Sequence, residues 1–162
     1  MSESQMADRK RNPFIKTPSG GRALSALQLP FFVVHPPSGF GVLTTTGRRS
    51  GKKRRKCVRA IRAGDRVYLV AIKGRTAWLK NLEAHPEVRL RIRGGTFTGV
   101  GRRLDSEEQD EASKAYCETL NPFDYLEFML WRSGRPSRSK VVELHRAFFQ
   151  EGTPLVIEPA TD

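Results

Sequence analysis

Residues 88–104, with the sequence VRLRIRGGTFTGVGRRL, predict two strands joined by a tight turn. From Val88 to Arg93 apolar side chains alternate with arginines, and a period of two is typical of a strand with one covered face. Gly94 and Gly95 supply a two-residue turn, after which residues 96–104 return as the second strand. The pattern predicts an antiparallel hairpin with one apolar and one basic face.

Further strands are predicted on both sides of this hairpin, because short runs rich in β-branched residues end at turn residues. These strands are residues 41–46 (GVLTTT), 58–62 (VRAIR), 66–72 (RVYLVAI) and 154–158 (PLVIE). Residues 66–72 are apolar on both faces, so we expect this strand to be covered on both sides. Such a strand belongs to a barrel or to a sheet with a lid.

Helices are predicted in three places. Residues 76–84 (TAWLKNLEA) have apolar side chains at helical spacing and end before a His-Pro pair, where proline disfavours helix. A capping signal at residues 105–106 begins a second helix that runs to Glu118, and residues 139–150 carry an apolar stripe that stops at Gly152. The order of elements predicts a mainly β, α+β protein: a small β-barrel with a short crossover helix and one or two C-terminal helices.

The length of 162 residues favours one domain with tails. Residues 1–21 mix charges with Pro, Ser and Gly and show no period, so we expect a flexible N-terminal arm there. A single barrel domain is expected over residues 22–160. Lys and Arg total 29 against 17 Asp and Glu, and the net charge of +12 attracts anionic partners.

Cysteine usage indicates a reduced compartment. Cys57 and Cys117 are too few for a disulfide scaffold and have no metal-binding spacing, so a cytoplasmic location is expected. The sequence shows neither a signal peptide nor a run long enough to span a membrane. The apolar segment within residues 22–34 contains Pro30 and leaves two options: packing against its own domain, or a peripheral membrane contact that would make the protein membrane-associated.

Catalysis by side chains alone has little support in the sequence. The three histidines, His35, His85 and His145, are far apart along the chain, so neither a Ser/His/Asp unit nor a metal centre is predicted. The glycine-rich phosphate loops of common nucleotide-binding proteins are missing from the sequence, as are zinc-finger and RNA-recognition motifs. We therefore expect no metal and no nucleic-acid partner.

The strongest chemical signal is residues 43–56, LTTTGRRSGKKRRK, in which seven of the nine residues from Arg48 to Lys56 are Lys or Arg. A strand end with hydroxyls followed by GRRSG offers backbone N–H groups and two guanidinium groups, a set that binds phosphate. A solvated basic loop and a nucleic-acid patch are the alternatives. The position between two predicted strands and the lack of interleaved aromatic residues disfavour the second.

Three motifs in this order, LTTTGRRSGKKRR, VAIKG and AWLKNLEAHPEV, resemble the deazaflavin-dependent nitroreductase and quinone reductase family. The resemblance covers residues 40–104, and it implies a split β-barrel of the FMN-binding-like type that binds coenzyme F420. It also implies hydride transfer from the reduced deazaflavin to an electron-poor small-molecule acceptor, such as a quinone, an enone or a nitro compound.

The resemblance leaves alternatives open. FMN is the alternative cofactor, and a non-catalytic binder of a lipid, a flavin or another small anionic ligand is the alternative function. Split barrels frequently dimerise through their sheets, so a homodimer is a further option.

The family pattern assigns roles to residues of this chain. The loop at Arg48–Ser50 matches the one that binds the coenzyme's phosphate, Ala71–Lys73 match the strand end along the deazaflavin ring, and the helix with Trp78 borders the same pocket. The full set implied for the cofactor is Thr46, Arg48, Arg49, Ser50, Gly51, Lys52, Arg54, Ala71, Ile72, Lys73, Trp78 and Asn81.

The acceptor side departs from the family pattern. The segment between Lys73 and Trp78 is shorter than in well-known nitro-reducing members, and Ile72 replaces the usual serine. A later aromatic segment, which includes Tyr125 and Trp131, either supplies substrate-side contacts as a lid over the ring or forms a helical core stripe. The cofactor is therefore better defined by the sequence than the acceptor is.

Overall fold

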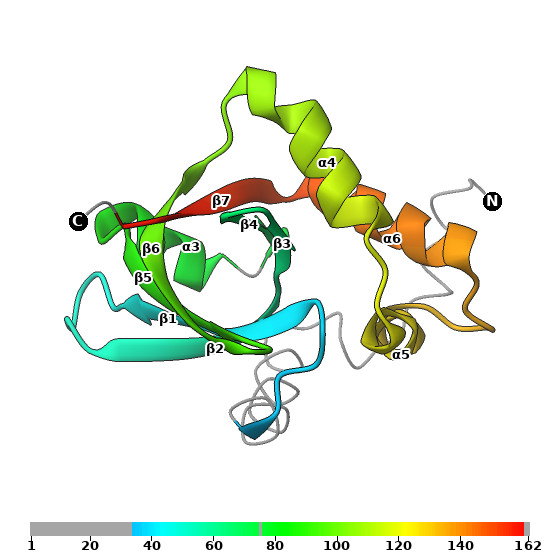
Figure 1. Ribbon diagram of the computed structural model, residues 1–162, viewed down its shortest axis with the longest axis horizontal. Helices are drawn as coiled ribbons and strands as arrows, with labels where there is room; N and C mark the ends of the chain where they lie inside the picture. Colours follow the sequence, from blue (N-terminus) through cyan, green and yellow to red (C-terminus); the bar gives the residue numbers. More distant parts are fainter. Residues whose placement is uncertain (1–33, 75, 161–162) are drawn as a thin grey trace.

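The computed structural model describes residues 34–74 and 76–160 and contains one curled antiparallel sheet with helices against one side (Figure 1). The strand order is β2-β1-β5-β6-β7-β4-β3. The strands are β1 (Phe40–Thr46), β2 (Lys53–Arg59), β3 (Ile61–Ala63), β4 (Arg66–Ala71), β5 (Glu87–Ile92), β6 (Gly95–Arg103) and β7 (Thr153–Pro159). The predicted α+β barrel architecture is confirmed.

Three sequence-based expectations concern residues outside the described ranges. The N-terminal arm over residues 1–21 and the start of the domain near residue 22 both lie there. So does the apolar segment within residues 22–34, apart from the exposed Val34. Within the described ranges, no helix combines the length and the apolar character needed to cross a bilayer.

The barrel is closed by one bent segment. β2 and β3 lie at opposite ends of the strand order, although only Ala60 separates them in sequence. At this bend the backbone N–H of Ala60 donates to the carbonyl of Gly39 at 2.8 Å. The same extended segment therefore pairs with β1 before the bend and with β4 after it.

Two local predictions were wrong. Lys53–Lys56 were expected in a loop but belong to β2, because this strand pairs with β1 over its whole length, from Thr46↔Lys53 to Phe40↔Arg59. Gly94–Gly95 were expected as the hairpin turn, but Ile92 pairs with Gly95, so Arg93 and Gly94 form it. Gly94 takes a φ of 94°, a left-handed conformation that glycine adopts at low cost.

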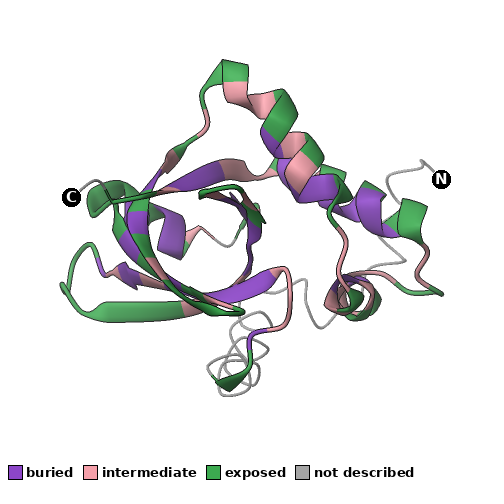
Figure 2. Cartoon of the chain, in the orientation of Figure 1, coloured by how far each residue is buried: buried purple, intermediate pink, exposed green. Residues whose placement is uncertain are grey.

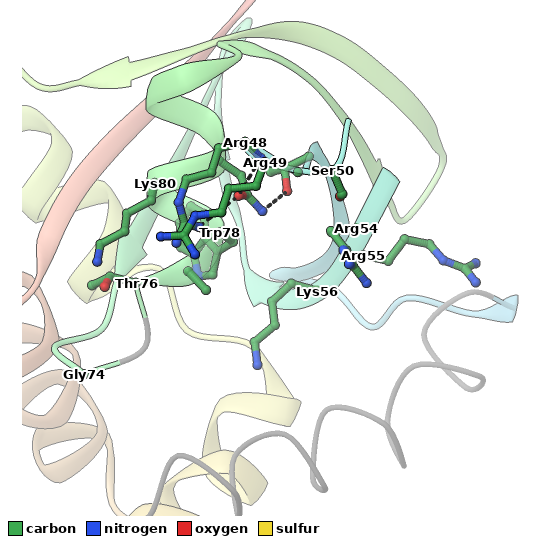
Figure 3. A pocket seen from close by; sticks show the side chains of 14 residues that line it. Arg48, Arg49, Ser50, Arg54, Arg55, Lys56, Gly74, Thr76, Trp78 and Lys80 are labelled. Carbon is green, nitrogen blue, oxygen red and sulfur yellow. Dashed lines mark hydrogen bonds between the residues drawn. The ribbon is translucent and has the colours of Figure 1, made fainter. Parts of the chain in front are cut away.

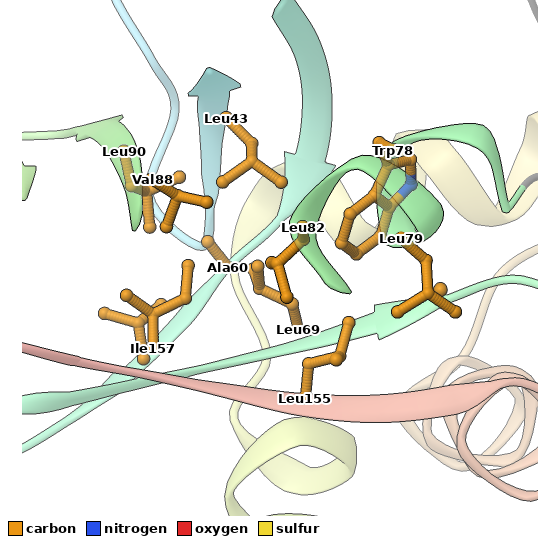
Figure 4. Close-up of a cluster of buried hydrophobic side chains, with 12 residues drawn as sticks. Leu43, Ala60, Leu69, Trp78, Leu79, Leu82, Val88, Leu90, Leu155 and Ile157 are labelled. Atoms are coloured by element: carbon orange, nitrogen blue, oxygen red, sulfur yellow. The ribbon is translucent and has the colours of Figure 1, made fainter. Parts of the chain in front are cut away.

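The barrel interior is filled by α3 (Ala77–Ala84), the predicted crossover helix. Trp78, Leu79 and Leu82 point from this helix into a core that also contains Leu43 and Leu155 (Figure 4). The predicted two-faced hairpin is also confirmed, because β5 alternates buried and exposed residues. Burial of these side chains removes apolar surface from water at about 25 cal/mol per Å² and holds α3 in place.

A second core lies outside the barrel, where the helices cover β4 and β7 (Figure 2). Tyr68 and Val70 of β4 pack into this core, while Leu69 of the same strand faces the barrel interior. The prediction that this strand is covered on both faces is therefore correct. The covering helices are α4 (Gln109–Glu118), α5 (Pro122–Trp131) and α6 (Arg138–Glu151), and the short helix η2 (Ser106–Glu108) leads into α4.

Three longer helices follow the hairpin, where one or two were predicted. α5 was missed, although its start has clear signals: Asn121 and Asp124 form a capping box, and Pro122 is the first helical residue. For the preceding helical segment, the predicted capping signal at residues 105–106 is present: Asp105 forms a capping box with Glu108 at the start of η2.

A buried arginine connects the barrel to these helices. Arg59 at the end of β2 donates from Nε to Oδ1 of Asp124 at 2.9 Å, and both side chains are almost fully buried. Its other guanidinium nitrogens donate to the carbonyl oxygens of Tyr116 and Thr119. The guanidinium also lies 4.4 Å from the centre of the Tyr116 ring. One side chain thus joins β2 to α4 and α5.

His145 lies beside this ion pair and makes stability depend on pH. Burial, with Arg59 as the second cause, lowers the pKa of His145 from 6.5 to about 3, against a weaker opposing contact with the Cys117 backbone. Neither ring nitrogen makes a regular hydrogen bond within the described residues. In the unfolded chain the imidazole takes up a proton near pH 6.5, whereas the folded state resists protonation.

The contribution of the neutral His145 to the free energy of unfolding is therefore expected to be complete above pH 6.5. As the pH drops from 6.5 toward 3, the free energy of unfolding should fall by up to about 1.4 kcal/mol per pH unit. Urea unfolding at several pH values between 5 and 7.5 measures this slope, since carboxylates contribute little there. His145→Leu is expected to flatten it. An equal slope in this variant and in the natural protein would assign the pH dependence to other groups.

Candidate functional site

The loop between β1 and β2 has a fixed backbone. The N–H of Gly47 donates to the carbonyl of Lys52 at 2.8 Å, and the N–H of Gly51 donates to the carbonyl of Gly47 at 2.9 Å. Gly51 has a φ of 67°, in the left-handed region that other residues rarely enter. Glycines at both ends of the loop thus allow a tight turn that exposes Arg48 and Arg49.

Asn81 of α3 holds this loop against the barrel. Its Oδ1 accepts hydrogen bonds from the backbone N and from Nη1 of Arg48, both at 3.2 Å. Its Nδ2 lies 3.5 Å from Oγ1 of Thr45, at the limit of a hydrogen bond. Because Asn81 is buried, we infer that it fixes the position of the arginine loop relative to the helix.

A basic cavity of about 800 Å³ lies between the loop, β2 and α3 (Figure 3). Six of its described lining residues carry a positive charge, and no described lining residue carries a carboxylate. The absence of a neutralising acid among these residues leaves a strong positive field in a concave site, which attracts and holds anions. The lining residues are Thr45, Gly47, Arg48, Arg49, Ser50, Arg54, Arg55, Lys56, Gly74, Thr76, Ala77, Trp78, Lys80 and Asn81.

The structure brings together half of the predicted cofactor residues. Arg48, Arg49, Ser50, Arg54, Trp78 and Asn81 all line the basic cavity. Thr46 at the end of β1 and Gly51 and Lys52 in the adjoining turn do not line the cavity. The Thr46 hydroxyl instead accepts from Lys53 Nζ at 2.9 Å, and the Lys52 N–H donates to Ser50 Oγ at 3.2 Å.

The predicted ring-binding strand end lies elsewhere. Ala71 is fully buried in the barrel core. Ile72 and Lys73 line a separate cavity of about 150 Å³, together with Trp131. Trp131 packs edge-on against Phe148, with ring centres 4.9 Å apart, and Tyr125 contacts the same outer core. The two predicted acceptor residues are therefore grouped with the helices and do not line the basic cavity.

Several lining residues were not among the cofactor residues that the resemblance implied. Arg55, Lys56 and Lys80 add three charges to the cavity, and Thr76 and Gly74 contribute from the segment before α3. Lys56 had a usable signal, because it is two residues after Arg54, and residues two apart in a strand point to the same face. That signal could not be applied while these residues were assigned to a loop.

A buried cluster beneath the helices was also missed. Asp124, Glu127 and His145 place possible metal-ligand atoms within 4.8 Å of one another. Asp124 is, however, already paired with the guanidinium of Arg59 at 2.9 Å. A cation there would stand beside a fixed positive charge, so we assign the cluster to the junction between barrel and helices.

The comparison with known families identifies the chain. A family model described as F420H(2)-dependent quinone reductase matches residues 33–128, more than half of the chain. The chain belongs to the F420H2-dependent quinone reductase family. Members of this family are oxidoreductases, and their cofactor is coenzyme F420. The match bears out the quinone reductase part of the predicted family name, whereas the nitroreductase part stays a prediction.

Solved structures confirm the split-barrel fold of this quinone reductase family member. An F420-H2-dependent reductase aligns with a TM-score of 0.51 and 22% identity over 75% of this chain and 95% of its own. A protein solved as a domain-swapped dimer aligns with a TM-score of 0.53 and 20% identity over 88% of this chain and 100% of its own. A heme-binding protein from Mycobacterium smegmatis aligns with a TM-score of 0.50 and 14% identity over 75% of this chain and 46% of its own. At these identities the likeness concerns the fold alone.

The basic cavity of the reductase fits its cofactor chemically. Coenzyme F420 carries a phosphodiester and a tail of glutamates, and the cavity offers guanidinium and ammonium groups without a competing acid among its described lining residues. The indole of Trp78 supplies an apolar wall beside these charges. Arg48 and Arg49 line the same cavity as this indole (Figure 3).

Proposed function

We propose that this protein is an F420H2-dependent reductase that reduces a quinone, with the coenzyme held in the basic cavity. The observation that carries the proposal is the set of six cationic side chains around Trp78 with no carboxylate among the described lining residues. An enone or a nitro compound is the alternative acceptor. When bound, the reduced coenzyme supplies the hydride, so the protein needs no catalytic triad.

The residues of the chain have separate roles in this proposal. Arg48 and Arg49 bind the phosphodiester, because guanidinium groups make paired, charge-assisted hydrogen bonds to phosphate oxygens. Ser50 adds a hydroxyl at the same loop. Asn81 acts as a positioning residue, since it contacts Arg48 through two hydrogen bonds. Trp78, Gly74 and Thr76 limit water access on the side of α3.

Titration with the oxidised coenzyme tests the first half of the proposal. Binding at low salt should quench the coenzyme's fluorescence, and the affinity should weaken as salt rises, because part of the attraction is between screened charges. If the coenzyme's fluorescence is not quenched at low salt, the proposal is wrong. Reduction of a quinone by the reduced coenzyme, followed by absorbance, tests the second half.

A non-catalytic binder is the second function to consider. It is favoured by one observation: Ile72 and Lys73, expected beside the ring, line the smaller cavity instead. In this case the protein would bind a lipid, a flavin or another small anionic ligand. FMN is the alternative cofactor in the same test. Coenzyme binding without reduction of a quinone, an enone or a nitro compound would support the binder.

Assembly and location remain proposals as well. A structural neighbour is described as a domain-swapped dimer, and this supports a homodimer as an option for the present chain. Light scattering during size-exclusion chromatography gives the mass in solution. A cytoplasmic location is proposed from the cysteine usage noted above.

A further inference from the structure

α5 exposes apolar side chains to solvent. Leu126 and Met129 each keep 47% of their surface exposed, and Pro122, about one turn before Leu126, is exposed as well. These three residues are spaced four and three apart, so they share one face of the helix, which we call the α5 stripe. The opposite face is buried through Asp124 and Phe128.

The neighbouring helices α4 and α6 have no such stripe. All of their exposed residues are polar or charged, as expected for helices with one face in water. α5 differs, because only two of its ten residues, Asp124 and Glu127, carry a charge. A helix that is apolar on both faces is usually covered on both. Within the described part of the chain, only one face of α5 has such a cover.

The described chain begins beside α5. A methyl group added at Gly39 would collide with the side-chain amide of Asn121, the residue just before this helix. The ring of Phe40 packs edge-on against that of Phe123, with ring centres 4.8 Å apart. Four residues separate Gly39 from Val34, the first described residue. The preceding part of the chain is therefore attached close to the start of α5.

That preceding part ends with the apolar segment noted in the sequence. Residues 24–34 read LSALQLPFFVV, in which only Ser25 and Gln28 are polar. Val34, its last residue, is 61% exposed. Burial of such a run removes apolar surface from water and is favourable. An apolar segment and an uncovered apolar stripe are thus close to each other along the path of the chain.

The segment can reach the α5 stripe through a short connection. The chain from Val34 to Gly39 spans at most about 18 Å when extended, and a helix of ten residues is about 15 Å long. A connection of this length keeps the segment at an effective concentration of about millimolar, so a small apolar contact suffices. A second copy of the chain lacks this advantage. Stable complexes bury about 800 Å² on each partner, and three partly exposed side chains offer far less.

We propose that residues 24–34 dock on the α5 stripe of the same chain. Phe31 and Phe32 supply rings for the thioether of Met129, a contact that sulfur and aromatic groups favour. In this arrangement the segment supports α5, whose Trp131 lines the smaller cavity. No residue of the basic cavity takes part, so the docking is independent of the proposed function.

Methyl NMR of the full chain tests this docking directly, because the sequence has three methionines, Met1, Met6 and Met129. After labelling with ¹³C-methyl methionine, the variant Met129→Leu identifies the Met129 signal by its loss. This signal should show nuclear Overhauser contacts to aromatic protons that disappear in Phe31→Leu/Phe32→Leu. Identical contacts in the natural protein and in this variant would overturn the proposal.

Hydrogen exchange followed by mass spectrometry measures the same contact from the side of the segment. Amides of residues 24–34 should exchange at least about tenfold more slowly in the natural protein than in Leu126→Gln/Met129→Gln, because this variant places polar groups in the stripe. The matched control Val100→Thr changes another exposed apolar residue, on β6, and should keep the protection. Slow exchange of α6 in every variant shows that the helices stay folded. Equal exchange of residues 24–34 in the natural protein and the stripe variant would contradict the docking.

Two other occupants of the stripe give different results, and either would overturn docking within one chain. If protection of residues 24–34 rises with protein concentration, together with the mass measured by light scattering, a second copy covers the stripe. If protection appears only after anionic phospholipid vesicles are added, the segment and the stripe form a membrane contact. We expect protection that is present without vesicles and independent of protein concentration.

Discussion

Replacing Arg48 and Arg49 together by alanine is expected to weaken binding of the oxidised coenzyme by about 2–5 kcal/mol, the largest effect we expect on ligand affinity. Both side chains line the basic cavity, and Arg48 is held in place by Asn81. Their loss removes charge-assisted hydrogen bonds to the phosphodiester. Each 1.4 kcal/mol is a tenfold change in affinity, so fluorescence titration resolves the effect easily.

Two further variants make this result specific. Lys114→Ala/Arg135→Ala removes the same number of charges from exposed positions on the helical side, and it should change affinity only slightly. Arg48→Lys/Arg49→Lys keeps the charge but loses the planar guanidinium fork, so we expect it to recover part of the binding. An unchanged affinity in the alanine variant would place the phosphate outside the loop.

Replacing Arg59 by methionine is expected to lower the free energy of unfolding by about 3–5 kcal/mol, because it leaves the buried Asp124 carboxylate without its partner. The carbonyl oxygens of Tyr116 and Thr119 also lose their donor. Since domains of this kind are stable by only about 5–15 kcal/mol, such a loss is a large part of the total. Urea unfolding followed by tryptophan fluorescence measures it.

A double variant keeps this prediction testable if the single one does not fold. Arg59→Met/Asp124→Leu removes both charges from the buried site, and it should regain part of the lost stability. The recovery is partial because Asp124 also accepts from the Asn121 N–H in the capping box of α5. Arg103 provides the control, since its ion pair with Glu83 is exposed and Arg103→Met should cost about 1 kcal/mol or less. A loss below about 1 kcal/mol for Arg59→Met would mean that the pair contributes little to the attachment of the helices.

Local periodicity explains which parts of the fold could be predicted. The hairpin of β5 and β6, the two-faced strand β4 and the helix α3 all have strong patterns within a few residues. The prediction of α5 failed because its aromatic residues were interpreted as a lid or as a helical core stripe, and no helix bounds were assigned to them. Its exposed Leu126 and Met129 weaken the contrast between its two faces.

The basic run shows the limit of local patterns. Consecutive Lys and Arg residues have low strand propensity, so Lys53–Lys56 were predicted as a loop. Pairing with β1 overrides this preference, since every residue of β2 has a partner in the sheet. The same pairing gives the run two faces, which no count of charges could reveal.

By itself, the sequence determined the family, the α+β barrel and the arginine loop, because each depends on motifs or periods that are local in the chain. Half of the predicted cofactor residues reached the basic cavity, namely those on the loop, β2 and α3. The tertiary structure decided the rest. Pairing with β1 makes residues 53–56 a strand whose side chains alternate between its two faces, while burial of Ala71 removes it from the cavity. Side-chain direction depends on long-range pairing, and pairing partners far apart in sequence are visible only in the folded chain.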